Sequence, residues 1–142
     1  MSMLDGHRNT KKQGDVGVGM AIGWCVSMGW TVSVPLTDSQ EYDLVAEING
    51  ILQKIQVKTT RYKTKYGFYN INISVKGGNR TSIGTIKHFD NSKVDFLFVI
   101  VGDGRMYFIP SKEVLATGCL TIGRKYDKCE VKFGSVWNGD QV

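Results

Sequence analysis

Three polar side chains with complementary chemistry lie near one another in the sequence: Asp43, Gln56 and Lys58. A carboxylate and an amide oxygen are hard ligands of the kind that Mg²⁺ prefers, and one or two carboxylates usually hold this ion together with a substrate phosphate. A lysine beside them can stabilise negative charge that develops on the phosphate, or help a water molecule lose its proton. These residue types together are suited to hydrolysing a phosphodiester.

The sequence between these residues predicts a β-hairpin. Residues 42–48 and 51–59 are patterned as strands, and Asn49-Gly50 separates them. An Asn-Gly pair between two such runs favours a type I′ turn, because that turn needs positive φ at both central positions. A two-residue turn also fixes the register, since Ile48 must then face Ile51 and every opposed pair of residue numbers must sum to 99.

In this register Asp43 opposes Gln56, and Glu41 opposes Lys58 on the same face of the hairpin. Opposed side chains have Cβ atoms about 4.5–5.5 Å apart, so Asp43 and Gln56 are close enough to contact one small ion. A solvated polar face is the simpler interpretation, because polar side chains are usually exposed. Two features favour a site instead: the residues lie inside a β-rich segment, and a strongly basic stretch follows.

That stretch is basic and aromatic, with no acidic residue between positions 54 and 65. A loop of this composition can hold phosphates, and Arg61 can reach the edge of a base. An ordinary solvated loop is the alternative, since charge runs often mark surface only. The DNA-binding candidates are Lys54, Arg61, Tyr62, Lys63, Lys65 and Tyr66.

Two runs, YDLV at 42–45 and IQVKTT at 55–60, resemble the PD-(D/E)xK nuclease superfamily. The resemblance is to group I intron-associated homing endonucleases in particular, in which a glutamine replaces the usual acid before x-K, and more distantly to archaeal Holliday-junction resolvases. It extends to GDVG at 14–17, VSVP at 32–35, DF at 95–96 and YFIP at 107–110, and so covers about residues 12–110.

The resemblance implies an α+β fold. We expect a single restriction-endonuclease-like domain, with a mixed central β-sheet flanked by helices and an N-terminal helix before the hairpin that carries the active site. This domain is expected to span residues 12–142, after a flexible N-terminus of residues 1–11.

The resemblance also implies a Mg²⁺-dependent endonuclease, with Mn²⁺ able to replace Mg²⁺, that cuts double-stranded DNA at a specific site. Asp43, Gln56 and the backbone of Val57 are then the metal ligands, and Lys58 is the catalytic lysine. A Holliday-junction resolvase on the same fold is the alternative. One site per chain predicts a homodimer or homotetramer, because cutting both strands needs two copies.

The chain departs from the family pattern in two places. Tyr42 stands where the superfamily has a proline before the catalytic aspartate, which matters little. Related proteins often carry a glutamate on the first helix, and this chain has Val18 there, so Asp15 is the nearest carboxylate that can replace it. A reduced number of acids keeps a second alternative open, a non-catalytic DNA-binding relative with a decayed site.

Composition is consistent with one soluble domain. The chain has 142 residues with a net charge of +5, and its three cysteines form no metal-binding pair, which fits a reducing cytoplasm. The 22 residues from 16 to 37 carry no charge, but they contain several glycines, an alternating strand pattern and Pro35. They therefore predict a helix followed by a strand, and no membrane partner.

The remaining elements follow from hydrophobic periodicity. Val16, Met20, Trp24 and Met28 recur every four residues and predict the buried stripe of a helix from about residue 12, which Gly29 ends. Strands are expected at 30–35, 67–75, 94–101 and 106–109, and the strand at 94–101 is apolar enough to be covered on both faces. The segment after Pro110 has no clear pattern.

Overall fold

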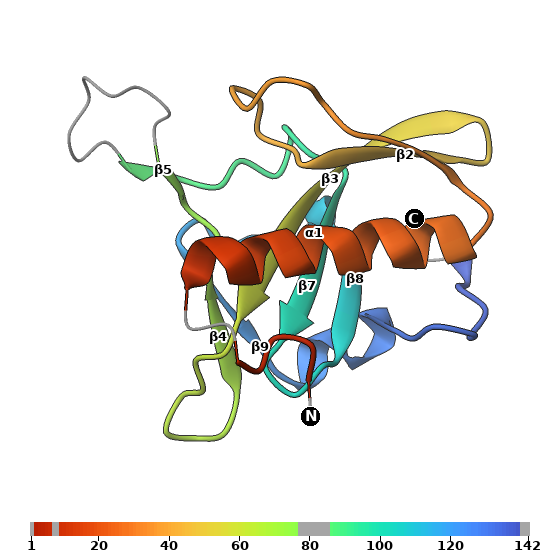
Figure 1. Cartoon of the computed structure of the whole chain (residues 1–142). Coiled ribbons are helices and arrows are strands. Elements are labelled where there is room, and N and C mark those ends of the chain that lie inside the picture. Colours follow the sequence, from red (N-terminus) through yellow and green to blue (C-terminus); the bar gives the residue numbers. More distant parts are fainter. Residues whose placement is uncertain (1, 7–8, 77–85, 140–142) are drawn as a thin grey trace.

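One long helix lies across the face of a six-stranded sheet in the computed structural model, which describes residues 2–6, 9–76 and 86–139 (Figure 1). Helix α1 (Thr10–Ser27) begins where the Asn9 side chain accepts a hydrogen bond from the backbone N–H of Lys11. It ends before Gly29, which has a φ of 85° and stops the helix as predicted.

The central sheet is mixed, as predicted. Strands β3 and β7 run parallel to each other, and every other neighbouring pair is antiparallel. The strand order is β1 (Thr31–Ser33), β2 (Leu44–Ile48), β3 (Ile51–Thr60), β7 (Phe96–Val101), β8 (Met106–Pro110) and β10 (Glu130–Val131).

The face of the sheet opposite α1 is covered by a second layer. The predicted strand at 67–75 is divided into β4 (Tyr69–Asn72) and β5 (Val75–Lys76), and β4 pairs with β9 (Cys119–Ile122) in a separate two-stranded sheet. Strand β5 pairs with β6 (Ile86–Lys87). The 3-10 turns η1 (Ser111–Glu113) and η2 (Arg124–Cys129) complete the segment that the sequence left unassigned.

The buried face of α1 differs from the predicted stripe. Trp24 is fully buried, but Val16, Met20 and Met28 are only half-buried. Small residues lie at the centre of the contact instead: a Cβ atom built on Gly17 would be 2.3 Å from Cγ2 of Thr59. The helix lies so close to β3 that larger side chains do not fit between them, and the apolar residues pack along its sides. The remaining buried residues of α1 are Gln13, Ala21 and Cys25.

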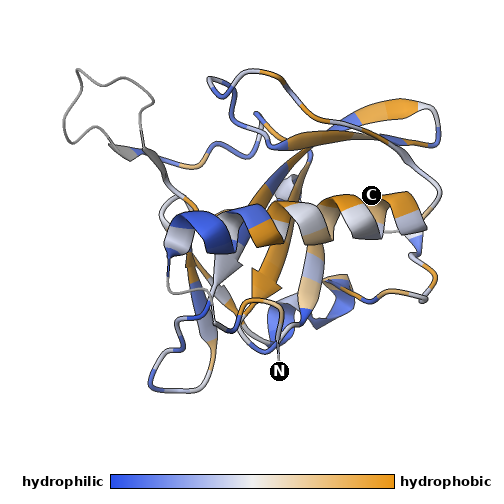
Figure 2. Cartoon of the chain, viewed as in Figure 1, coloured by the Kyte–Doolittle hydropathy of each residue, from blue (hydrophilic) through white to orange (hydrophobic). Residues whose placement is uncertain are grey.

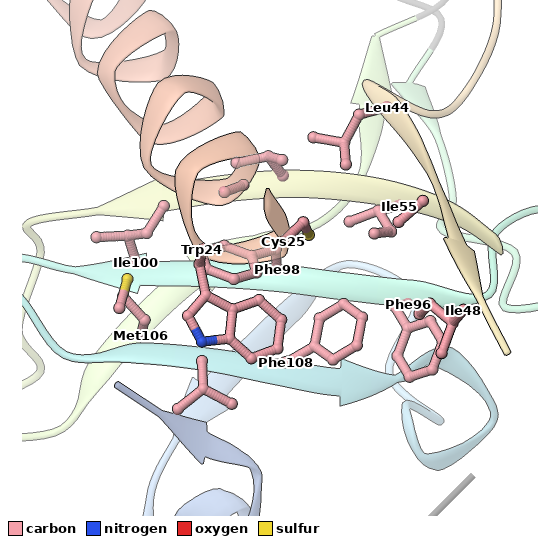
Figure 3. Close-up of a cluster of buried hydrophobic side chains, with 14 of the residues drawn as sticks. Trp24, Cys25, Leu44, Ile48, Ile55, Phe96, Phe98, Ile100, Met106 and Phe108 are labelled. Carbon is pink, nitrogen blue, oxygen red and sulfur yellow. The ribbon is translucent and has the colours of Figure 1, made fainter. Parts of the chain in front are cut away.

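Two hydrophobic clusters fill the spaces on either side of the sheet. The cluster under α1 is rich in aromatic rings: Trp24 packs against Phe98 and Phe108, and the rings of Phe96 and Phe108 stack with centroids 4.1 Å apart (Figure 3). All six residues of β7 are buried, as predicted for a strand covered on both faces. The second cluster joins the far side of β7 to β4, β9 and η2.

The N-terminal segment takes part in the fold. Leu4 is fully buried in the cluster under α1, and α1 begins at Thr10, within the terminus predicted to be flexible. Residues 1, 7, 8 and 140–142 lie outside the described ranges, and the domain limits stay a prediction.

In the described part of the chain, no helix is both long and apolar enough to cross a membrane. Figure 2 shows that α1 is polar in its first turns and apolar towards its end.

Candidate active site

The hairpin forms as predicted from the Asn-Gly pair. Asn49 and Gly50 have φ values of 53° and 79°, the two positive angles that a type I′ turn requires. The observed pairs run from Ile48–Ile51 to Leu44–Ile55, and each pair sums to 99. The predicted register is therefore confirmed over the length of β2.

Asp43 lies immediately before β2 and forms hydrogen bonds with three consecutive residues of β3. Its backbone N–H donates to the carbonyl of Ile55 at 2.9 Å. Its carboxylate oxygen Oδ2 accepts two hydrogen bonds, from the backbone N–H of Val57 at 2.7 Å and from Nε2 of Gln56 at 3.0 Å. The contact predicted between Asp43 and Gln56 is thus present, and the carboxylate caps the edge of β3 where β2 stops pairing.

Lys58 lies on the same face of β3 as Gln56, one pleat further along. Burial lowers the pKa of Lys58, while the charge of Asp43 acts in the opposite direction and raises it. Burial likewise raises the pKa of Asp43, and the hydrogen bond from Val57 and the charge of Lys58 partly offset that rise. The two groups are half-buried and electrostatically coupled, which is an arrangement found more often at functional sites than on ordinary surface.

The donor set fits a hard divalent cation. The hydrogen bonds from Gln56 and Val57 to the Asp43 side chain both reach Oδ2, so neither of them uses Oδ1. The side-chain amide of Gln56 contacts Asp43 through Nε2, and the same amide carries an oxygen, Oε1, that could bind a cation. Oxygen ligands with a single carboxylate suit Mg²⁺, which keeps several waters and takes further ligands from substrate phosphate. Across residues 2–6, 9–76 and 86–139, no three His, Cys, Asp or Glu residues cluster as a metal site.

Asp15 is not brought to this site. It is exposed on α1, roughly 200° around the helix from the buried Gln13. Helix α1 packs on the face of β3 that carries Val57, whereas Gln56 and Lys58 point to the opposite face. Val18, at the position of the family's helix glutamate, is a half-buried member of the cluster under α1.

The predicted DNA-binding residues divide into two places. Arg61, Lys63 and Lys65 lie in the turn between β3 and β4, where Nζ of Lys63 lies 5.1 Å from the centroid of the Tyr69 ring. Tyr62 and Tyr66 are exposed in the same turn, at 67% and 75%. Lys54 lies six residues before Thr60, about 20 Å away along β3. Its Nζ lies 5.7 Å from the centroid of the Tyr42 ring.

Three contacts around the site were not expected from the sequence. The predicted opposition of Glu41 and Lys58 is wrong, because the pairing of β2 with β3 ends at Leu44. Glu41 instead forms an ion pair with Lys87 at 3.2 Å. Asp95 accepts a hydrogen bond from the backbone N–H of Lys54 at 2.8 Å, and its own N–H donates to the Lys54 carbonyl at 2.9 Å. Gln13 donates to Oγ1 of Thr59 at 3.1 Å. The contacts of Glu41 and Asp95 involve loops whose path the strand pattern does not predict. The contact of Gln13 could have been expected, because a polar side chain on the helix face towards the sheet needs a hydrogen-bond partner there.

Comparisons with known proteins identify a family and a similar solved structure. A family model described as PD-(D/E)XK endonuclease matches residues 8–131. The solved structure of a bacterial homing endonuclease, I-Ssp6803I, is similar to this chain with 30% sequence identity and a TM-score of 0.69, over 82% of this chain and 79% of that chain. Curated protein sequences contain no match.

Proposed function

The chain belongs to the PD-(D/E)XK endonuclease family. On that basis we propose that it is a metal-dependent, homing-type endonuclease that cuts both strands of DNA, with an active site formed by Asp43, Gln56 and Lys58. The observation that carries the proposal is the contact of Asp43 with Gln56 and Val57 beside the half-buried Lys58. Membership of the family makes DNA the expected substrate. The similarity to a bacterial homing endonuclease supports the homing type.

Asp43, the side-chain oxygen of Gln56 and the carbonyl of Val57 are the groups that would hold the cation. A bound Mg²⁺ or Mn²⁺ would supply positive charge at the scissile phosphate and make a coordinated water more acidic. The amide of Gln56 now donates from Nε2 to Asp43. A half-turn of this amide about its terminal side-chain bond would present its oxygen beside the carboxylate instead.

Lys58 would supply the second positive charge of the site. Its lowered pKa comes from burial, and the negative charge of Asp43 favours the protonated form. A protonated ammonium group beside the phosphate stabilises the charge that accumulates as the phosphodiester is attacked. Asp43 would therefore have two functions, because it would hold the cation and its charge favours the protonated form of Lys58.

Cutting two strands with one site per chain needs a second copy, so we propose a homodimer or homotetramer as the active form. A non-catalytic DNA-binding protein is the second candidate, and one observation favours it: Asp15 is exposed on α1 and does not add a second carboxylate beside Asp43. A Holliday-junction resolvase would share the chemistry and differ in cutting four-way junctions in preference to linear duplex.

The test is nicking of supercoiled plasmid DNA in the presence of Mg²⁺. We expect Lys58→Ala to lower the nicking rate by about 10²–10³-fold, because it removes a charge that acts in the transition state, while DNA binding without divalent ions persists. Lys112→Ala is the matched control, since Lys112 is an exposed lysine outside the site and should leave nicking unchanged. Nicking that is equal in the wild type and in Lys58→Ala would remove the catalytic assignment.

A further inference from the structure

A cavity of about 640 Å³ lies beside the end of β3, and its lining from this part of the chain begins at Thr59, the residue after Lys58. Its walls come from the first turn of α1, the end of β3 and strand β4, which Figure 1 shows next to one another. We call it the edge cavity. Its lining residues include Thr10, Gln13, Thr60, Arg61, Asn70 and Asn72.

The lining of the edge cavity suits an anion. Arg61 brings a guanidinium group that stays charged at any physiological pH. The side-chain amides of Asn70 and Asn72 can supply further hydrogen-bond donors around it, whereas the Thr60 hydroxyl donates to the Asn70 carbonyl. Among the described residues that line the cavity there is no Asp or Glu. A phosphate therefore meets attraction on several sides and no opposing carboxylate.

The open edge of β3 adds a backbone donor. Strand β2 pairs with β3 only as far as Leu44–Ile55, and Asp43 caps the next peptide group on that side, the N–H of Val57. Peptide groups of alternate residues point to the same side of a strand, so the N–H of Thr59 points to the same edge. Thr59 lines the edge cavity, which therefore continues the edge that carries the active site.

The walls of the edge cavity are connected by hydrogen bonds between elements. Gln13, only 9% exposed, donates from α1 to Oγ1 of Thr59 at 3.1 Å. Thr60 donates from β3 to the carbonyl of Asn70 on β4 at 2.8 Å. Because these contacts fix the three elements relative to one another, the cavity exists before any ligand binds, and little ordering is needed to fill it.

We propose that the edge cavity binds a phosphodiester group of the DNA strand being cut, close to the scissile one. Lys58 and Thr60 are two residues apart on one face of β3, a distance of about 6.6–6.8 Å. A DNA strand offers a phosphate for every 3.4 Å or so of helix axis. A strand whose scissile phosphate lies at Asp43 and Lys58 therefore has neighbouring phosphates within reach of the cavity. The inference rests on the proposed function and assigns a substrate subsite beyond the catalytic residues.

Cys119 provides a chemical test without a mutation. It lines the edge cavity and is exposed, whereas Cys25 and Cys129 are buried. Burial raises the pKa of Cys25 to about 12 and that of Cys129 to about 11, which leaves both thiols poorly reactive. Methanethiosulfonate reagents that carry either a sulfonate or a trimethylammonium group can therefore place opposite charges at one position.

We expect the sulfonate-labelled protein to bind a DNA duplex about tenfold more weakly than the trimethylammonium-labelled protein, in the absence of divalent ions. For the sulfonate-labelled protein, the slope of the logarithm of the DNA association constant against the logarithm of the salt concentration should also be less steep by about 1, because one phosphate contact is lost. Bound DNA should also slow the labelling of Cys119. Equal affinities for the two labelled proteins, or labelling that DNA does not slow, would overturn the subsite.

A pair of variants separates the cavity from a general effect of charge. Asn72→Asp adds a negative charge at the cavity and keeps the acceptor that bonds the N–H of Ser74 at 2.9 Å. Asn49→Asp makes the same change at the hairpin turn, where Asp-Gly also suits type I′. Only Asn72→Asp should weaken DNA binding; equal losses in both variants contradict the subsite. If the unlabelled protein nicks plasmid while these tests fail, the subsite alone is wrong, and if it neither binds nor nicks DNA, the proposed function is wrong as well.

Discussion

The two faces of β3 carry different kinds of residue on one backbone. Ile55 and Val57 point to one face and are buried under α1. Gln56 and Lys58 point to the other face and are half-buried beside Asp43. Alternation along the strand places the two sets a single residue apart. Packing on the first face therefore holds the chemical groups of the second face in position, without a dedicated loop.

The two faces differ in their effect on stability. On the packed face, close approach of Gly17 to Thr59 removes surface from water and leaves little free space. On the polar face, burial raises the pKa of Asp43 and lowers that of Lys58, so each charged form is disfavoured relative to water. We infer that shape limits substitution on the first face, and that charge limits it on the second.

The largest effect in this comparison should come from filling the gap between α1 and β3. Gly17→Ala places a Cβ atom where Thr59 already lies 2.3 Å away, and Thr59 has little freedom to move because Gln13 bonds its hydroxyl group. We expect the free energy of unfolding to fall by about 1–3 kcal/mol, measured by urea denaturation.

Gly19→Ala is the matched control on the same helix. A Cβ atom at Gly19 would meet nothing within 4 Å, so this change should stabilise the protein by about 0.5–1 kcal/mol through the higher helix propensity of alanine. If the two variants changed stability equally, close packing of α1 on β3 would not be the feature that distinguishes this face.

A smaller effect should follow from adding a charge to the polar face. Gln56→Glu places a second carboxylate against Asp43, whose Oδ2 is now 3.0 Å from Nε2 of Gln56. We expect Mn²⁺ to bind about tenfold more tightly, because a second anionic ligand strengthens the attraction for the cation. Isothermal titration calorimetry with Mn²⁺ measures the change.

Gln53→Glu is the control for that change. Gln53 lies on the same strand but on the other face, where it pairs with Ala46. Its substitution should leave Mn²⁺ binding as it is in the wild type. A similar gain from both variants would mean that the added negative charge acts at long range and that the face of the strand does not matter.

The hairpin could be predicted because its determinants are local. Asn49-Gly50 fixes the turn, and alternation fixes which residues share a face, so the contact of Asp43 with Gln56 follows from a few neighbouring residues. The reading of Lys58 as a catalytic residue needed the family resemblance as well, since a lysine on a strand is usually a solvated surface residue.

The elements that could not be predicted depend on distant partners. Strand β4 pairs with β9, which follows about 50 residues later, and nothing in either segment specifies the other. The buried face of α1 was misread because apolar spacing marks large residues, whereas the centre of this contact is Gly17. Small residues are required there because β3 lies so close to the helix, and hydrophobic periodicity carries no information about that distance.

The smallest effect concerns the coupling of Asp43 and Lys58 across pH. The cation would compete with a proton for Asp43, whose pKa is raised by burial and partly lowered again by Val57 and Lys58. Lys58→Met removes the lowering by the lysine charge, so the Asp43 pKa should rise further. We therefore expect the acidic limb of Mn²⁺ binding to move to higher pH in this variant.

Stability without metal should follow the same direction. A carboxyl whose pKa in the folded protein is raised above its ordinary value of 3.8 adds stability below the unfolded pKa, and that stability is lost as the pH rises through the folded pKa. The free energy of unfolding should therefore decrease over this window in the wild type, decrease at higher pH in Lys58→Met, and lack the step in Asp43→Asn. A step at unchanged pH in Lys58→Met would mean that the lysine does not act on Asp43, and the polar face would then be three independent side chains instead of one coupled site.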